Sequence, residues 1–263
     1  MSHQAKKRFG QNFLKDKNLL KKIVDKAEIK DQFVIEIGPG QGALTGFLAQ
    51  AAKHVKAYEI DYSLEPMLSA IQKEYDNLEI IYQDFLKIDL NQLGKPHHVV
   101  ANVPYYITTP ILFKLLEANN IASATMMIQK EVCDRIMATP KDKQYNALSI
   151  IVQSMAEVKK VMDVKRQLFY PVPNVDSAVI RLKMYDVPKL NTKGIILVKA
   201  AFQQKRKTLV NNLHQAYGIE KPLLEQFLID QKIDPNIRAE DLTLDDFIKL
   251  NDVCAFKNTP LKT

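Results

Sequence analysis

The stretch Phe33–Gly42, FVIEIGPGQG, decides the fold that this sequence predicts. Its first five residues form an apolar run of strand character, and glycines follow at positions 38, 40 and 42, directly before a helical pattern. Glycine lets the backbone turn sharply and approach a ligand where a side chain would collide, so a nucleotide-like ligand is expected. The third glycine comes one position earlier than in the dinucleotide motif G-x-G-x-x-G, which argues against a nicotinamide cofactor. A tight turn without a ligand is the alternative interpretation.

Strand and helix patterns alternate on both sides of this stretch. Further strand-like runs occupy residues 55–59, 78–82, 98–101 and 124–128, and helical patterns with apolar residues three or four apart occupy 43–52, 63–75 and 110–117. This alternation predicts an α/β fold in which helices cover both faces of a parallel sheet. Two later runs, 158–164 and 177–184, have no long helix between them and predict an antiparallel hairpin at one sheet edge.

The character of the chain changes after Tyr185. The segment 185–194, YDVPKLNTKG, resembles a linker, and only helical periodicity follows it, at 195–204, 208–216, 222–231 and 244–253. The sequence therefore predicts a first domain over 1–185, with a basic N-terminal arm at 1–15, and a small all-helical domain over 186–263.

The composition is that of an ordinary globular protein of the cytoplasm. The chain has 263 residues, of which 46% are hydrophobic and 25% are charged. No segment approaches the roughly 20 apolar residues that span a bilayer, and the N-terminus has no apolar signal segment. Cys133 and Cys254 are far apart, and the five histidines have no metal-ligand spacing. We expect a monomeric protein without a metal ion or a membrane partner.

Positive charge is concentrated in two parts of the chain. The formal net charge is +7, and residues 1–30 hold nine Lys or Arg residues against three acidic residues. A second run, Lys199–Lys207, contains four basic residues and no acid. Solvated helix faces would explain either run alone. Together with a pI near 9.1 they favour a polyanionic partner such as RNA.

Acidic side chains end the two strand-like runs that follow the glycine-rich turn. Glu59 comes 21 residues after Gly38, where a carboxylate can accept both hydroxyls of a ribose, and Asp84 can accept a hydrogen bond from an adenine amino group. Each acid alone would be explained as a surface residue. With the glycine-rich turn they predict an adenosine-containing cofactor, and S-adenosylmethionine is favoured because no lysine of the phosphate-binding type is present.

The fourth strand-like run ends in Asn102-Val103-Pro104-Tyr105. A turn rimmed by an aromatic residue is the structural interpretation. The chemical interpretation is methylation of an amino group, because the Asn102 amide oxygen and the Val103 carbonyl can accept the two hydrogens of an adenine N6 and direct its lone pair at a methyl donor. Pro104 restricts the backbone before it, and Tyr105 offers a flat face to an extruded base. Such a site works by orientation and electrostatics.

Seven motifs along nearly the whole chain resemble one family, the small-subunit ribosomal RNA adenine N6,N6-dimethyltransferases. They are KKRFGQNFL, EIGPGQGALT, NVPYYITTP, QKEVCDRI, FYPVPNVDSAVIRL, AFQQKRKTL and IDPNIRAEDLTLDDF. The last three favour this family over the similar large-subunit methylases that give macrolide resistance. The resemblance implies a Rossmann-like S-adenosylmethionine-dependent domain and dimethylation of two adjacent adenosines in a hairpin loop near the 3′ end of the RNA, within a ribosomal subunit precursor.

The resemblance also assigns site residues. It implies that the cofactor is bound by Asn12, Leu14, Gly38, Gly40, Glu59, Asp84 and Asn102. Asn102 and Tyr105 are expected to be catalytic, and the substrate is expected to contact Tyr105, Phe169, Lys205, Arg206 and Lys207. Gln41 and Phe85 depart from residues that are frequent in the family, which concerns only cofactor packing.

Three hypotheses follow for the function. The first is dimethylation of small-subunit RNA, and the second is methylation of another adenine, in large-subunit RNA or in DNA. The third is an RNA-binding assembly or transcription factor that keeps the fold without turnover. The intact Asn102–Tyr105 sequence argues against the third, because a binding module has no use for paired acceptors at N6.

Overall fold

The computed structural model describes residues 12–14 and 16–253. Of the predicted arm over 1–15, only residues 12–14 fall within the described part, and Cys254 lies outside it. The chain divides into two compact units, the first comprising Met1–Cys133 with Val158–Met184 and the second Asp134–Glu157 with Tyr185–Thr263. The helical unit thus includes residues 134–157 in addition to the C-terminal segment that the sequence predicts.

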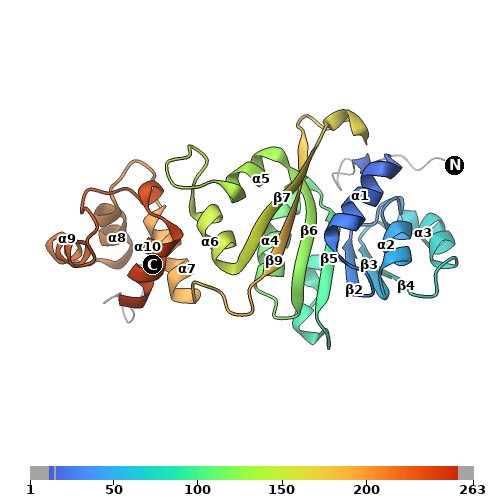
Figure 1. The fold of residues 1–263 in the computed structure, drawn as a ribbon, viewed down its shortest axis with the longest axis horizontal. Coiled ribbons are helices and arrows are strands. Elements are labelled where there is room, and N and C mark those ends of the chain that lie inside the picture. The colour runs from blue at the N-terminus through green and yellow to red at the C-terminus, as the bar shows by residue number, and fades with distance from the viewer. Residues whose placement is uncertain (1–11, 15, 254–263) are drawn as a thin grey trace. The chain divides into compact units, whose positions relative to one another are not determined.

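The first unit is built on a seven-stranded sheet with the order β4-β3-β2-β5-β6-β9-β7 (Figure 1). The strands are β2 (Phe33–Ile37), β3 (His54–Glu59), β4 (Leu78–Tyr82), β5 (His97–Asn102), β6 (Ile121–Gln129), β7 (Ala156–Val164) and β9 (Ser177–Met184). Strands β4, β3, β2, β5 and β6 are parallel, and β9 is antiparallel to β6. The predicted α/β class is confirmed, and the two late runs are hydrogen-bonded neighbours at one sheet edge, as expected.

Helices cover the sheet because both faces of its parallel strands are apolar. On one face lie α1 (Lys17–Ala27) and α2 (Thr45–Ala51), whose apolar side chains share one core cluster with β2, β3 and β5. Helix α3 (Glu65–Gln72) packs against β4, and α4 (Thr108–Leu116) packs against β6 with buried residues outside that cluster. Helix α5 (Lys130–Met137) directly follows β6.

The centre of the sheet is a topological switch point. Strand β2 lies between β3 and β5, so the chain leaves β2 toward one edge and later returns to its other side. In open parallel sheets the connections diverge at such a point and leave a crevice at the carboxyl ends of the strands. The glycine-rich turn after β2 and the Asn102 motif after β5 therefore lie at the same crevice.

A second, two-stranded sheet was not predicted from the sequence. Strands β1 (Phe13–Leu14) and β8 (Phe169–Tyr170) pair antiparallel, with Phe13 opposite Tyr170 and Leu14 opposite Phe169. This pairing joins the start of the described chain to the segment between β7 and β9. It keeps Asn12 and the β1 residues beside the crevice.

The second compact unit is helical. Its helices are α6 (Ala147–Met155), α7 (Thr192–Ala201), α8 (Leu209–Tyr217), α9 (Lys221–Asp230) and α10 (Leu244–Val253). The last four agree with the predicted runs, whereas α6 was not predicted. The side chain of Asn146 caps α6, and the Tyr145 hydroxyl donates to the Leu242 carbonyl at 2.9 Å, which ties α6 to the segment before α10.

Candidate cofactor and substrate site

A cavity of about 270 Å³ lies at the carboxyl ends of the central strands of the first unit. Its wall is formed by the β1 segment, the turn after β2 and the ends of β3, β4 and β5. Eight of the predicted site residues line it: Asn12, Leu14, Gly38, Gly40, Glu59, Asp84, Asn102 and Tyr105. The structure thus brings together side chains that are up to 93 positions apart in the sequence.

The glycine-rich turn has a backbone that other residues rarely adopt. Gly38, Gly40 and Gly42 have φ angles of +67°, +58° and +77°. A Cβ atom on Gly40 would lie 3.0 Å from the ring of Phe13, and a Cβ atom on Gly42 would collide with Ile71. The glycines therefore allow the turn to fit between β1 and α3 while its backbone faces the cavity.

Glu59 is held by the backbone around it. One carboxylate oxygen accepts hydrogen bonds from the N–H groups of Ile60 at 2.9 Å and Asp61 at 2.8 Å, and the other accepts from Gly40 N–H at 3.0 Å. Only 4% of the residue is exposed. Burial raises the pKa of Glu59, although these backbone N–H groups lower it in part. The bond to Gly40 joins the end of β3 to the glycine-rich turn and fixes the carboxylate at the cavity wall.

Asp84 follows β4 and lines the cavity with a fixed orientation. One of its carboxylate oxygens accepts from the Leu86 N–H at 3.0 Å, which caps the short 3₁₀ turn Phe85–Lys87. Phe85 is buried, and its ring meets the Tyr58 ring edge-on with centroids 5.8 Å apart. Phe85 and Tyr58 both belong to the lining of the cavity, so this ring contact forms part of its wall.

Asn102 ends β5 with its amide group oriented. The Asn102 Nδ2 group donates to the main-chain carbonyl of Asn12 at 3.1 Å, so Oδ1 is the acceptor that remains for a ligand. The next residue, Val103, donates its N–H to the Met127 carbonyl of β6 at 3.2 Å. Of the two expected acceptor residues, Asn102 is therefore attached to the segment at β1 and Val103 to strand β6.

Tyr105 begins a 3₁₀ turn, Tyr105–Ile107, and lines the cavity with its ring half-buried. Its hydroxyl lies 2.7 Å from the Ser177 hydroxyl. Burial raises the pKa of Tyr105, so the phenol is neutral at physiological pH. The neighbouring Tyr106 is 59% exposed at the rim.

A further carboxyl group of the cavity, Glu36, received no role from the sequence. Glu36 lies inside the apolar strand β2, and only 2% of it is exposed. Its Oε2 atom lacks a hydrogen-bond partner within residues 12–14 and 16–253. Burial raises the pKa of Glu36 from its ordinary value of 4.5 to about 8. An acid in the middle of an apolar strand was the feature that could have identified it.

The cavity wall is acidic. Glu36, Glu59 and Asp84 line it, and no Lys, Arg or His is among the lining residues in the part of the chain that the structure describes. Phosphate groups are normally bound by Lys, Arg or backbone N–H groups, whereas carboxylates attract cations. The Glu59 and Asp84 carboxylates therefore fit a cationic ligand such as the sulfonium and ammonium groups of S-adenosylmethionine, whereas Glu36, with its pKa raised to about 8, is mostly neutral at pH 7. Within the described residues there is also no group of three or more His, Cys, Asp or Glu side chains that could hold a metal ion.

Comparison with known proteins agrees with this geometry. The family model for ribosomal RNA adenine dimethylase matches residues 2–255. The chain belongs to this family. The resemblance that the seven motifs indicate is thereby confirmed.

Several relatives are similar over most of their length. A ribosomal RNA small subunit methyltransferase A of Onion yellows phytoplasma is 48% identical over 259 residues, covering 95% of this chain and 96% of the relative. The protein of the same name from Bacillus pumilus is 46% identical over 264 residues, covering 94% and 90%. Among solved structures, a dimethyladenosine transferase from Plasmodium falciparum has a TM-score of 0.80 at 30% identity, covering 90% of this chain and 95% of that chain. The 23S rRNA methyltransferase ErmE has a TM-score of 0.75 at 29% identity, covering 92% and 98%.

The remaining residues that the family resemblance implicates lie elsewhere. Phe169 is 4% exposed, belongs to the hydrophobic core cluster and does not line the cavity in the described structure. A contact between Phe169 and a base would require it to leave this cluster, and the contact stays a prediction. Lys205, Arg206 and Lys207 lie on an exposed turn between α7 and α8 in the second unit, and their contact with RNA also stays a prediction. In the described residues no helix is long and apolar enough to cross a membrane.

Proposed function

We propose that this chain transfers methyl groups from S-adenosylmethionine to N6 of two adjacent adenosines in a hairpin loop near the 3′ end of small-subunit ribosomal RNA, giving N6,N6-dimethyladenosine. The observation that carries the proposal is a cavity that is lined by acidic side chains and by the Asn102–Tyr105 segment and that has no basic side chain among the described residues of its lining. The names of the two relatives described above support the small subunit as the source of the RNA.

The cofactor residues have separate tasks in this proposal. Glu59 accepts the ribose hydroxyls, because its Oε2 atom accepts only the Gly40 N–H in the described structure and keeps further acceptor capacity. Asp84 accepts from the adenine amino group, while Gly38 and Gly40 bring the backbone close to the amino-acid part. Asn12 and Leu14 cover the ligand from the β1 segment. When bound, S-adenosylmethionine supplies an electrophilic methyl group on a positively charged sulfur.

Asn102 and Val103 activate the target amino group by orientation. The lone pair of adenine N6 is delocalised into the ring, which makes the nitrogen a poor nucleophile. Two oxygen acceptors, Asn102 Oδ1 and the Val103 carbonyl, bind the N6 hydrogens and favour a geometry in which the lone pair points at the methyl group. The attachments of these residues to Asn12 and Met127 make them preorganised acceptors.

A second transfer uses the same groups. After the first transfer N6 keeps one hydrogen, which Asn102 or Val103 can still accept while the base stacks on Tyr105. Dimethyladenosine is therefore the expected end product. The small helical domain over 186–263 contributes RNA contacts, with Lys205, Arg206 and Lys207 against phosphates.

Methylation of isolated subunits tests the proposal. The purified protein is incubated with labelled S-adenosylmethionine and small subunits that lack the modification, and the nucleosides are then analysed by mass spectrometry. We expect dimethyladenosine at two adjacent positions, much slower action on a short protein-free hairpin and none on duplex DNA, because selectivity comes from the shape of a large partner. Transfer to large-subunit RNA or DNA instead, or binding without transfer, would contradict the proposal.

A further inference from the structure

The hydroxyl of Tyr105, which follows β5, has a partner at the start of β9, two strands away from β5 in the sheet. Its oxygen lies 2.7 Å from Ser177 Oγ, although the two residues are 72 positions apart. Ser177 is completely buried and is the first residue of β9. Ser177 does not line the cavity, so it does not meet a ligand there itself.

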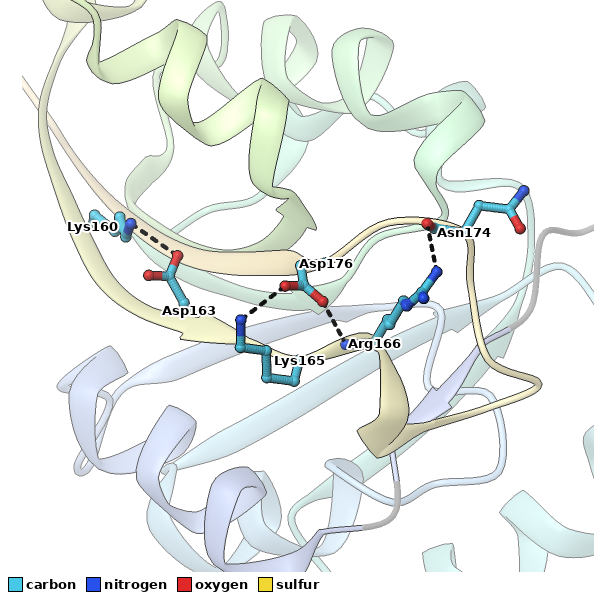
Figure 2. A network of polar contacts seen from close by, with 6 residues as sticks. All are labelled: Lys160, Asp163, Lys165, Arg166, Asn174 and Asp176. Carbon is cyan, nitrogen blue, oxygen red and sulfur yellow. Dashed lines mark hydrogen bonds and ion pairs between the residues drawn. The ribbon is translucent and has the colours of Figure 1, made fainter.

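The backbone at Ser177 is fixed by β6 and by the residue before it. Ser177 pairs with Gln129 at the carboxyl end of β6. The Asp176 carboxylate accepts from Lys165 Nζ at 3.1 Å and from the Arg166 N–H at 3.0 Å, and the Asp176 carbonyl accepts from the Lys130 N–H at 3.0 Å. Figure 2 shows the Asp176 carboxylate between Lys165 and Arg166, where the chain from β7 approaches β9.

A second contact closes the loop that runs from Lys165 to Asp176. The guanidinium of Arg166 donates to the Asn174 carbonyl at 3.1 Å, as Figure 2 shows. Both ends of the 165–176 loop are thus joined, and Ser177 follows directly. These exposed contacts contribute little to overall stability one by one. They are local contacts that hold the backbone of the residue directly before Ser177.

We propose that Ser177 is a positioning residue that fixes the ring of Tyr105 for the target base, with the Asp176 contacts holding Ser177 in place. The proposal rests on the proposed function, in which Tyr105 stacks on that base. A tyrosine ring is attached to the backbone at one end, and the first side-chain torsion sets the direction of the ring axis. A hydrogen bond at the hydroxyl, which lies on that axis, holds the axis in one direction and so fixes where the ring lies for the base. The same bond directs the hydroxyl toward β9, which makes the phenol a support for the ring and gives it no part in proton transfer.

A double-mutant cycle tests the coupling. We compare Ser177→Ala, Tyr105→Phe and the double variant with the wild type in dimethylation of subunits. Each single variant should lower kcat by roughly three- to tenfold, the effect of one lost hydrogen bond, and the double variant should lower it no further. KM for S-adenosylmethionine should stay unchanged. Tyr105→Phe removes one oxygen and leaves the fully buried Ser177 in place, so the test holds even if Ser177→Ala folds poorly.

Ser123→Ala is the matched control. Ser123 is also buried, on β6, and its hydroxyl contacts His98 Nδ1 at 2.8 Å at the opposite end of the strand. The control loses a buried serine contact without affecting Tyr105, so its kcat should equal that of the wild type. Wild-type kcat in Ser177→Ala, or effects of Ser177→Ala and Tyr105→Phe that multiply, would overturn the proposal.

A measurement without turnover separates this proposal from the proposed function. In protein labelled with 3-fluorotyrosine, the Tyr105 fluorine resonance is assigned by its loss in Tyr105→Phe. It should shift in Ser177→Ala and stay in place in Ser123→Ala. An unmoved resonance would overturn the positioning role. A wild type that transfers no methyl group, with the shift present, would instead refute the proposed function and leave the Tyr105–Ser177 contact established.

Discussion

Replacing Glu36 by glutamine should change how the stability of this protein depends on pH. Glu36 is 2% exposed, its Oε2 atom lacks a partner within the described residues, and burial raises its pKa from 4.5 to about 8. The folded protein therefore holds a proton on Glu36 over a pH range in which the unfolded chain has released it. Glutamine resembles the protonated acid in shape and does not titrate.

The sign and size follow from this difference in proton binding. Between about pH 4.5 and pH 8 the folded state binds more protons than the unfolded state, so the free energy of unfolding falls as the pH rises. The stabilising contribution of the protonated Glu36 to the free energy of unfolding is fully present below pH 4.5 and is lost as the pH rises through about 8. At about 1.4 kcal/mol for each pH unit, the loss across this range is on the order of 5 kcal/mol.

Urea denaturation of the wild type and Glu36→Gln at several pH values measures the effect. The difference between their free energies of unfolding should shift in favour of the variant by about 1.4 kcal/mol for each pH unit between about pH 5 and pH 8 and should level off above that range. Glu79→Gln is the matched control, because Glu79 is an exposed strand glutamate that pairs with Lys56 at 3.6 Å. Parallel pH profiles of wild type and Glu36→Gln would refute the reasoning, since Glu36 would then be ionised in the folded protein.

Three further predictions concern the proposed function. Asn102→Ala should raise the barrier to transfer by about 2.7 to 4 kcal/mol, measured by single-turnover kinetics, with a smaller change in cofactor affinity; near wild-type turnover would exclude its role. Glu59→Ala should weaken S-adenosylmethionine binding by about tenfold to more than a hundredfold, from the loss of charged hydrogen bonds, and unchanged affinity by calorimetry would make Glu59 a purely structural acid. Charge reversal at Lys205, Arg206 and Lys207 together should flatten the dependence of log RNA affinity on log salt by roughly 0.7 to 0.9 for each lost phosphate contact. If RNA affinity does not fall, this turn is not an RNA contact.

The parallel sheet could be predicted because the local sequence marks where its strands begin and end. The run Phe33–Ile37 is continuously apolar except for Glu36 and ends at Gly38, and the structure places β2 over those same five residues. Helix α6 could not be predicted in the same way. Its sequence, ALSIIVQSM, includes three consecutive β-branched residues that also suit a strand, and the helix depends on the Asn146 cap.

The part of the candidate site that lies at the ends of parallel strands could be predicted from the sequence. The part that depends on the pairing of β1 with β8 could not. Glu59, Asp84 and Asn102 each follow or end a parallel strand, so their proximity follows from the topology. The β1–β8 strands are two residues long and pair over 155 positions, from Leu14 to Phe169, so no local pattern specifies them. That pairing also buries Phe169, which the motif alone would leave beside the base.

The acidic wall of the cavity has a consequence for repeated turnover. Two methyl groups on each of two adenosines require four cofactor molecules for each substrate, and the spent cofactor must be exchanged three times between the transfers. The Glu59 and Asp84 carboxylates line the cavity, and within the described residues no basic side chain does, so the wall attracts a ligand with a positively charged sulfur more strongly than the neutral thioether that remains after transfer. Inhibition of the enzyme by the neutral product is thereby weakened. When S-adenosylmethionine and the product are present together, the site binds the charged S-adenosylmethionine in preference, which favours replacement of the spent cofactor.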